Sequence, residues 1–291
     1  MELNTLLQLL ISGISMGAVY GLIALGYMSV FNSSGVINFA QGDYVMLGGL
    51  ITAFLFHNIG LSYIYAAIIA MICTVIYGVL TGVLIIYPLK KASVLILVIA
   101  TLGISTFTQN TASLIFGRYP LSLPPLIKMK SLDVFGAKVS PQNIFIIIIS
   151  VLILVLLSLI TNHTMFGKAM QASSTDKLSA KLVGISPSTV VLASFAISAA
   201  VGSIGGIIIA PVFFTSYSVG TLLGLKGFVA GVIGGWGKTN GAFVGGLILG
   251  VIESLSVGFI SSGYKDAIAF IVLIAILYFL PRGIFRSDAI D

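Results

Sequence analysis

A carboxylate and two amides interrupt an apolar stretch of the chain. In GVINFAQGDYVMLGG (35–49), Asp43 lies beside Asn38, Gln41 and the glycine Gly42. A charge at the centre of a membrane helix costs about 3 kcal/mol or more, so such groups should face a cavity or a polar partner. These residues therefore either line a path for a small polar solute or cap the start of a helix, and the sequence leaves both open.

Lys226 and Glu253 are the other ionisable side chains that fall in or near apolar segments. One interpretation places Glu253 on the same solute path. The other makes these residues contacts between helices, or places them at the membrane interface, where long side chains reach water at little cost. Lys226 could pair with Asp43 or with Glu253, and the sequence does not choose between them.

No catalytic motif accompanies these polar residues. The chain has no GxxxxGK[ST] phosphate loop, no paired cysteine and histidine ligands and no nucleophile elbow. We therefore expect no enzymatic activity, no metal site and no cofactor bound by this chain. If ATP drives transport here, separate subunits must hydrolyse it.

The composition determines the class of protein. Hydrophobic residues make up 58% of the 291 positions and charged residues only 8%, whereas a soluble domain carries roughly 25% charged residues. Most of the surface must therefore face lipid or other apolar helices. The apolar runs are long and continuous, which favours helices over a membrane barrel. We predict an all-α, polytopic integral membrane protein with a single domain over residues 1–291.

The apolar segments predict about eight to nine transmembrane helices. They lie at roughly 5–31, 37–57, 62–87, 92–117, 142–162, 188–211, 219–237, 240–261 and 264–281. Segment 219–237 is rich in glycine and either spans the membrane or forms a broken, re-entrant helix. Glycines four residues apart, such as Gly13, Gly17, Gly246 and Gly250, predict helices whose backbones approach closely, mainly within one subunit and, for one or two pairs, at a subunit interface.

Two polar interruptions separate the apolar segments. Residues 118–141 are proline-rich and predict a structured external loop, and residues 163–187 predict a cytoplasmic loop with two short helical stretches. Loops on the cytoplasmic side carry an excess of Lys and Arg, which places the amino terminus outside for nine crossings. The predicted cytoplasmic set is Lys90, Lys91, Lys168, Lys177, Lys181, Lys238, Arg282 and Arg286, and the outer set is Arg118, Lys128, Lys130, Lys138 and Lys265. Topology thus accounts for the basic residues, and we expect no nucleic-acid partner.

Four stretches of the chain together resemble a known family. GAVYGLIALGYMSVFNSSGVINFAQGDYVMLGG (17–49) is similar to the signature of the branched-chain amino acid ABC importer permeases of the high-affinity Leu/Ile/Val type. The stretches at 167–211, 224–254 and 264–285 resemble later blocks of the same family in matching order. The form NFAQGD resembles the first of the family's two membrane subunits rather than its longer paralogue.

The resemblance implies an importer of several subunits in the cell (inner or plasma) membrane. Two permease subunits form the path, two ABC ATPase subunits lie on the cytoplasmic face, and an external solute-binding protein delivers leucine, isoleucine or valine. By resemblance, Ala180, Lys181 and Gly184 in SAKLVGI belong to the loop that contacts the ATPase. Gln171 stands where family members commonly have arginine, which leaves the docking contacts open.

Alternatives to this solute and mechanism remain open at the level of sequence. Related permeases carry urea, short amides or other small solutes. An ion-coupled secondary transporter that acts alone is a further alternative, less favoured because the apolar segments contain few acidic or histidine relays.

Overall fold

Eleven α-helices, one 3-10 turn and one β-hairpin make up the described part of the chain, which comprises residues 3–86, 88–89, 92–127, 131–134 and 137–285 of a computed structural model. The elements are α1 (Leu3–Ser34), α2 (Gln41–Asn58), α3 (Tyr63–Ile86), α4 (Val94–Phe116), β1 (Leu132–Val134), β2 (Ala137–Val139), α5 (Pro141–His163), α6 (Met165–Thr175), α7 (Lys177–Leu182), α8 (Pro187–Ile209), α9 (Val219–Gly234), α10 (Thr239–Phe259), η1 (Ser262–Tyr264) and α11 (Lys265–Phe279).

Each of the nine predicted apolar segments contains one long helix. Seven of them are long and apolar enough to cross a membrane, namely α1, α3, α4, α5, α8, α10 and η1 with α11. Helix α9 has 16 residues and so measures about 24 Å, which is shorter than a hydrocarbon core of about 30 Å. Helix α2 has 18 residues, with Gln41 and Asp43 in its first turn. The predicted all-α membrane architecture is confirmed, and α2 and α9 are interior helices with many buried residues, as are α1 and α8.

Helix α1 packs lengthwise against α10 through glycines. A Cβ added at Gly17 would lie 2.7 Å from the Gly246 carbonyl oxygen, and one added at Gly250 would lie 2.3 Å from the Gly17 nitrogen. Such distances leave no room for a side chain, so the two backbones are in direct contact. Close approach of this kind gains van der Waals contact where lipid supplies no hydrophobic drive between helices. The predicted packing of glycines within one subunit is confirmed here.

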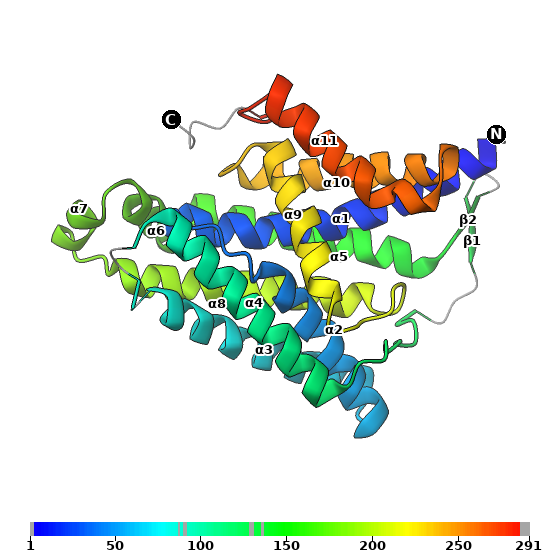
Figure 1. Cartoon of the computed structure of the whole chain (residues 1–291), viewed down its shortest axis with the longest axis horizontal. Helices are drawn as coiled ribbons and strands as arrows, with labels where there is room; N and C mark the ends of the chain where they lie inside the picture. Colours follow the sequence, from blue (N-terminus) through cyan, green and yellow to red (C-terminus); the bar gives the residue numbers. More distant parts are fainter. Residues whose placement is uncertain (1–2, 87, 90–91, 128–130, 135–136, 286–291) are drawn as a thin grey trace.

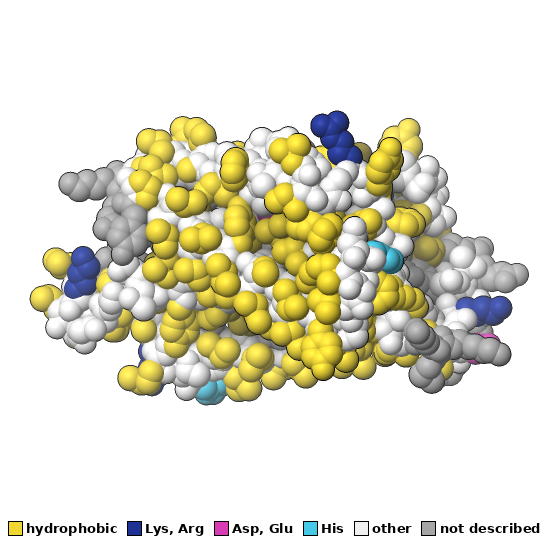
Figure 2. Space-filling view, turned by 90° about the horizontal axis from the view of Figure 1, so that it is seen from below, with side chains coloured by type: hydrophobic (Ala, Val, Ile, Leu, Met, Phe, Trp, Pro, Cys, Tyr) yellow, Lys and Arg dark blue, Asp and Glu magenta, His cyan; other side chains and the backbone are white. Residues whose placement is uncertain are grey.

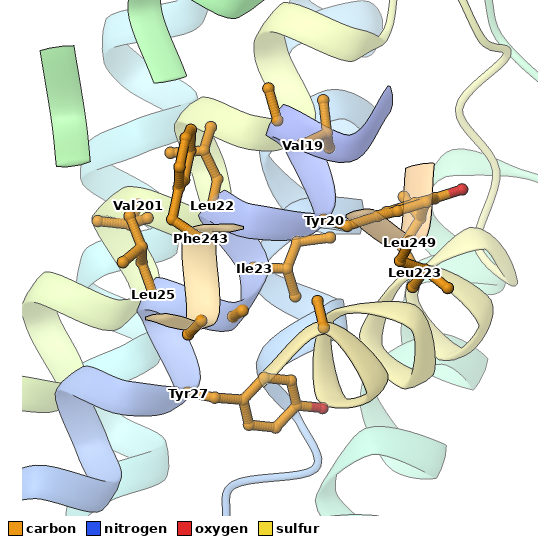
Figure 3. Close-up of a cluster of buried hydrophobic side chains, with 14 of the residues drawn as sticks. Val19, Tyr20, Leu22, Ile23, Leu25, Tyr27, Val201, Leu223, Phe243 and Leu249 are labelled. Carbon is orange, nitrogen blue, oxygen red and sulfur yellow. The ribbon is translucent and has the colours of Figure 1, made fainter. Parts of the chain in front are cut away.

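Side chains of α1 fill the space between its neighbours. In Figure 3, Tyr20 and Tyr27 point to one side of α1, while Leu25 lies on the other side near Val201. All of these side chains are buried. Helix α1 is therefore a central element of the bundle, with α8, α9 and α10 around it.

Large apolar side chains on the outer helices are exposed. Ile64 of α3 is 66% exposed and Leu114 of α4 is 81% exposed. Hydrophobic side chains cover most of the face seen in Figure 2, and the lysine and arginine side chains visible there lie near its edges. A soluble protein rarely exposes an apolar surface of this extent, so lipid or another membrane subunit must cover it.

A short hairpin lies in the predicted loop 118–141, where the sequence predicted no strand. Strands β1 and β2 pair antiparallel, with Leu132 opposite Val139. The backbone N–H and C=O groups of the two strands pair with each other, as buried or ordered backbone groups outside helices require. The hairpin and α7 lie at opposite ends of the molecule (Figure 1), as the prediction of loops on opposite membrane faces requires. Five of the basic residues used for that orientation lie outside the described residues, namely Lys90, Lys91, Lys128, Lys130 and Arg286.

Candidate functional site

The helical backbone is interrupted between α1 and α2, as the stretch NSSG predicts. Helix α1 ends at Ser34, and Gly35 follows in the left-handed region with φ 71°. The Gly35 nitrogen donates to the Phe31 carbonyl at 2.8 Å. Glycine is favoured here because a Cβ is disfavoured at positive φ, and a helix commonly ends in this way. The break lets the residues that follow enter the interior as a new helix start.

Asn38 lies in the turn before α2 and is 1% exposed. Its side-chain oxygen accepts from the Ala40 nitrogen at 3.2 Å, and its amide nitrogen donates to the Tyr44 hydroxyl at 3.2 Å. The Tyr44 hydroxyl in turn meets Thr81 of α3 at 2.5 Å. Asn38 thus stabilises the turn and connects it to α3, but the N-cap position of α2 belongs to Ala40.

Gln41 and Gly42 form the tightest contacts at the start of α2. The Gln41 side-chain nitrogen donates to the Ser198 carbonyl at 3.2 Å, and its oxygen accepts from the Ser198 hydroxyl. A Cβ added at Gly42 would lie 1.9 Å from the Gly220 carbonyl oxygen of α9. Gln41 therefore connects α2 to α8, and Gly42 lets the backbone of α9 approach that of α2.

Asp43 is fully buried and joins three helices. Its Oδ1 accepts from the side-chain nitrogen of Gln109 in α4 at 2.9 Å. The Thr221 hydroxyl of α9 donates to the Gln109 side-chain oxygen at 3.1 Å. Asp43 Oδ2 has no hydrogen-bond partner among the described residues. Gln109 and Thr221 both reach the surface of the described chain, so they separate Asp43 from the outside. We call Asn38, Gln41, Asp43 and Gln109 the α2 cluster.

Lys226 pairs with Glu253 and not with Asp43. The Lys226 ammonium lies 2.9 Å from Glu253 Oε1 and 2.7 Å from Asp266 Oδ1. The Tyr20 hydroxyl donates to Glu253 Oε2 at 2.8 Å, and the Lys265 ammonium lies 3.7 Å from that same oxygen. We call these five residues the Lys226 cluster. Buried ions are stable only when paired and hydrogen-bonded, which this arrangement provides for Lys226 and Glu253.

The sequence missed several residues in or next to the two clusters. Gln109 and Thr221 carry no charge and lie in apolar segments, so nothing in the sequence connects them to Asp43. Lys265 was predicted only as one of the basic residues on the outer side, and Asp266 was not singled out. The one signal that pointed to them is the acidic residue in the first turn of α11, where a helix favours negative charge.

The predicted loop 163–187 forms helices α6 and α7, as its two helical stretches predict. Asp176 is the N-cap of α7, where its carboxylate accepts from the Ser179 hydroxyl and from the Leu178 nitrogen. These hydrogen bonds lower the pKa of Asp176 below its ordinary value, and the bond from the Ser179 hydroxyl has the largest effect. The cap is thus present above the ordinary pKa of an aspartate and is lost as the pH falls through the lowered value.

The residues predicted to couple to an ATPase divide between the two sides of α7. Ala180 is buried at 2% exposed, whereas Lys181 and Gly184 are exposed. Gly184 has φ 83° and its nitrogen donates to the Lys181 carbonyl at 3.0 Å. Two apolar side chains at this end are also exposed, Leu182 at 82% and Val183 at 74%.

The amino-acid sequence matches one protein family over most of its length. The sequence profile of the permease component of the branched-chain amino acid transport system matches residues 9–277. The chain belongs to this family.

Two named relatives are similar to this permease over almost their whole length, and a third over about two thirds of its length. The high-affinity branched-chain amino acid transport system permease protein LivH of Salmonella typhimurium is 33% identical, covering 98% of this chain and 97% of the relative. BraD of Pseudomonas aeruginosa, of the same description, is 31% identical over 100% and 99% of the two chains. LivM of Salmonella typhimurium is 23% identical, over 93% of this chain and 68% of LivM. The permease therefore resembles LivH more than LivM, in agreement with the predicted first subunit.

A solved structure has a similar fold. PsaBC from Streptococcus pneumoniae in complex with Fab matches with a TM-score of 0.50 and 15% identity, over 96% of this permease and 91% of that chain. At this identity the match concerns the fold alone.

Proposed function

We propose that this chain is a membrane-spanning permease subunit of an ATP-driven ABC importer that translocates leucine, isoleucine and valine. The observation that carries the proposal is the similarity over nearly the full length to relatives named as high-affinity branched-chain amino acid permeases. Its seven long apolar helices support a place in the cell membrane, which would be the inner or plasma membrane.

ATP would be hydrolysed on separate ATPase subunits, because this chain carries no phosphate-binding loop. A second permease subunit, related as LivM is to LivH, would complete the path. An external solute-binding protein would deliver the amino acid. No cofactor or metal is needed in this chain for that role.

Helix α7 is our candidate for the contact with an ATPase. Ala180 faces inward and holds α7 to the chain, while Leu182 and Val183 project from the same end. Exposed apolar side chains on an ordered helix favour binding of a protein partner. A short helix held in this way can pass a rigid-body movement from the ATPase to α8.

The path role predicted for Asn38, Gln41, Gly42 and Asp43 stays a prediction. Their side chains are occupied by the contacts described above, so we propose that they act on the path indirectly. Asp43 holds Gln109, and Gln109 with Thr221 presents polar groups at the surface of α4 and α9. The predicted role of Glu253 is taken up below through its cluster.

Uptake of labelled solutes tests the proposed function. The chain would be reconstituted in proteoliposomes with its partner permease, ATPases and binding protein, and supplied with leucine, urea or acetamide. We expect ATP-dependent accumulation of leucine, and competition by isoleucine and valine. Accumulation of urea or acetamide in place of leucine would overturn the proposed solute, and uptake without ATP would overturn the ABC mechanism.

Gly184→Leu tests the proposed role of α7. A side chain is disfavoured at φ 83°, so the end of α7 must shift. We expect leucine uptake to fall about tenfold, equal to about 1.4 kcal/mol, while ATP hydrolysis continues. Gly103→Leu is the matched control, because a Cβ at that glycine meets nothing within 4 Å. Equal uptake by both variants would rule out the coupling role of this turn.

A further inference from the structure

A cavity of about 360 Å³ opens beside the Lys226 cluster. Binding pockets for small molecules usually measure roughly 300–1,000 Å³ and combine apolar walls with a few polar groups. Phe213, Phe214 and Leu222 contribute apolar wall to this cavity, and Lys226, Lys265 and Asp266 line its polar end. The cavity therefore has the size and the division of surface that an amphipathic small molecule needs.

The charges at the polar end differ in how firmly they are held. Lys226 is buried between two carboxylates, at 2.9 Å from Glu253 and 2.7 Å from Asp266. The Asp266 side chain is 50% exposed and that of Lys265 is 28% exposed. Lys265 lies 3.7 Å from Glu253, beyond the usual distance of a strong hydrogen bond. Asp266 and Lys265 thus keep capacity for a further partner.

The four ions of the cluster balance, with two lysines against two carboxylates. A ligand with a net charge would leave one uncompensated ion in a region of low dielectric, which is costly. A zwitterion brings one charge of each sign and preserves the balance. Its ammonium finds a carboxylate in Asp266, and its carboxylate finds an ammonium in Lys265.

We propose that this cavity binds a small zwitterion with an apolar side chain. The ammonium binds Asp266, the carboxylate binds Lys265, and the side chain packs against Phe213, Phe214 and Leu222. This inference rests on the proposed function and deepens it, because leucine, isoleucine and valine are zwitterions of this kind. It gives Glu253 an indirect role, because Glu253 lies behind the cavity wall and holds Lys226 and Lys265 in place.

Equilibrium binding of labelled leucine tests the inference. The probe is added to the complete permease–ATPase complex without ATP and without the binding protein, so that only a site in the complex can hold it. We expect saturable binding that Asp266→Asn and Lys265→Gln each weaken about tenfold, equal to about 1.4 kcal/mol. Both substituted side chains are partly exposed, so these variants should fold. Lys138→Gln on β2, an exposed lysine outside the cavity, should bind as the unsubstituted complex does.

Analogues lacking one charge complete the test. The acid 4-methylpentanoate lacks the ammonium, and 3-methylbutylamine lacks the carboxylate. We expect each to compete with leucine at least tenfold more weakly than isoleucine does. Absence of saturable leucine binding, equal competition by either analogue, or unchanged binding in both variants would overturn the inference. ATP-driven uptake by the unsubstituted importer is measured on the same preparation, so that failure of the cavity and failure of the proposed function are separate results.

Discussion

Asp43 and Glu253 are carboxylates that are both buried among apolar helices, yet their surroundings differ. Asp43 meets the neutral amide of Gln109, and no cation pairs with it among the described residues. Glu253 meets Lys226, Lys265 and the Tyr20 hydroxyl. Asn38, Gln41 and Asp43 of the α2 cluster are buried and only Gln109 reaches the surface, whereas the Lys226 cluster borders a cavity of about 360 Å³.

The difference shows that an ionisable residue at membrane depth can have either of two roles. In the α2 cluster, the polar atoms connect the start of α2 to α3, α4 and α8 through hydrogen bonds. In the Lys226 cluster, the charges satisfy one another but leave Lys265 and Asp266 partly exposed. A rule based on residue type alone predicts a solute path at both places. Access to a cavity distinguishes them.

The largest effect should come from a bulky side chain at the contact between α2 and α9, beside the α2 cluster. Gly42→Leu would place a side chain where a Cβ alone is 1.9 Å from the Gly220 carbonyl oxygen. Overpacking of this kind costs about 3 kcal/mol or more when backbone must move. We expect little monodisperse protein after purification, measured by size-exclusion chromatography. Normal recovery would mean that α2 and α9 are not in contact. Gly103→Leu, on the open face of α4, controls for the added hydrophobic side chain.

Glu253→Gln should be the next most damaging change. It removes a counter-charge from buried Lys226 and leaves only Asp266. Breaking a buried ion pair in this way costs about 3–5 kcal/mol. The measurement is the midpoint of thermal unfolding in detergent, which we expect to fall by several degrees. An unchanged midpoint would show that the Lys226–Glu253 pair does not stabilise the fold.

Asp43→Asn should have the smallest effect, although Asp43 is as deeply buried. The asparagine oxygen can accept from Gln109 as the carboxylate does, and there is no buried cation to leave unpaired within the described chain. We expect a loss of about 1 kcal/mol or less, the scale of one neutral hydrogen bond. Unfolding is followed as for Glu253→Gln. A loss as large as in that variant would contradict the distinction between the clusters.

The sequence predicted the helices well because their cause is local. Long apolar runs predict α3, α5 and α8, and the glycines at 17 and 246 predict a close helix contact without naming the partner. The break after Ser34 also follows from neighbouring residues. By contrast, the β1–β2 hairpin is made by residues that carry no strong strand pattern, and was not predicted.

The site could be predicted only in part, because its contacts join distant segments. Tyr20 and Glu253 are 233 positions apart, and their hydrogen bond depends on how α1 and α10 pack. Asp266 reaches Lys226 because η1 turns the chain so that α11 returns along α10. One sequence shows that such polar groups need partners but does not show which ones they find.

We propose that the amino acid contacts the Lys226 cluster directly, whereas the α2 cluster makes no contact with it and acts only through the packing of α2, α4 and α9. The most direct test compares the leucine affinity of Asp266→Asn and Asp43→Asn in the same permease–ATPase complex. We expect about tenfold weaker binding for Asp266→Asn. For Asp43→Asn we expect an affinity within about twofold of the unsubstituted complex, because the change removes at most one neutral hydrogen bond from the fold. Tenfold weakening in Asp43→Asn with unchanged affinity in Asp266→Asn would contradict it.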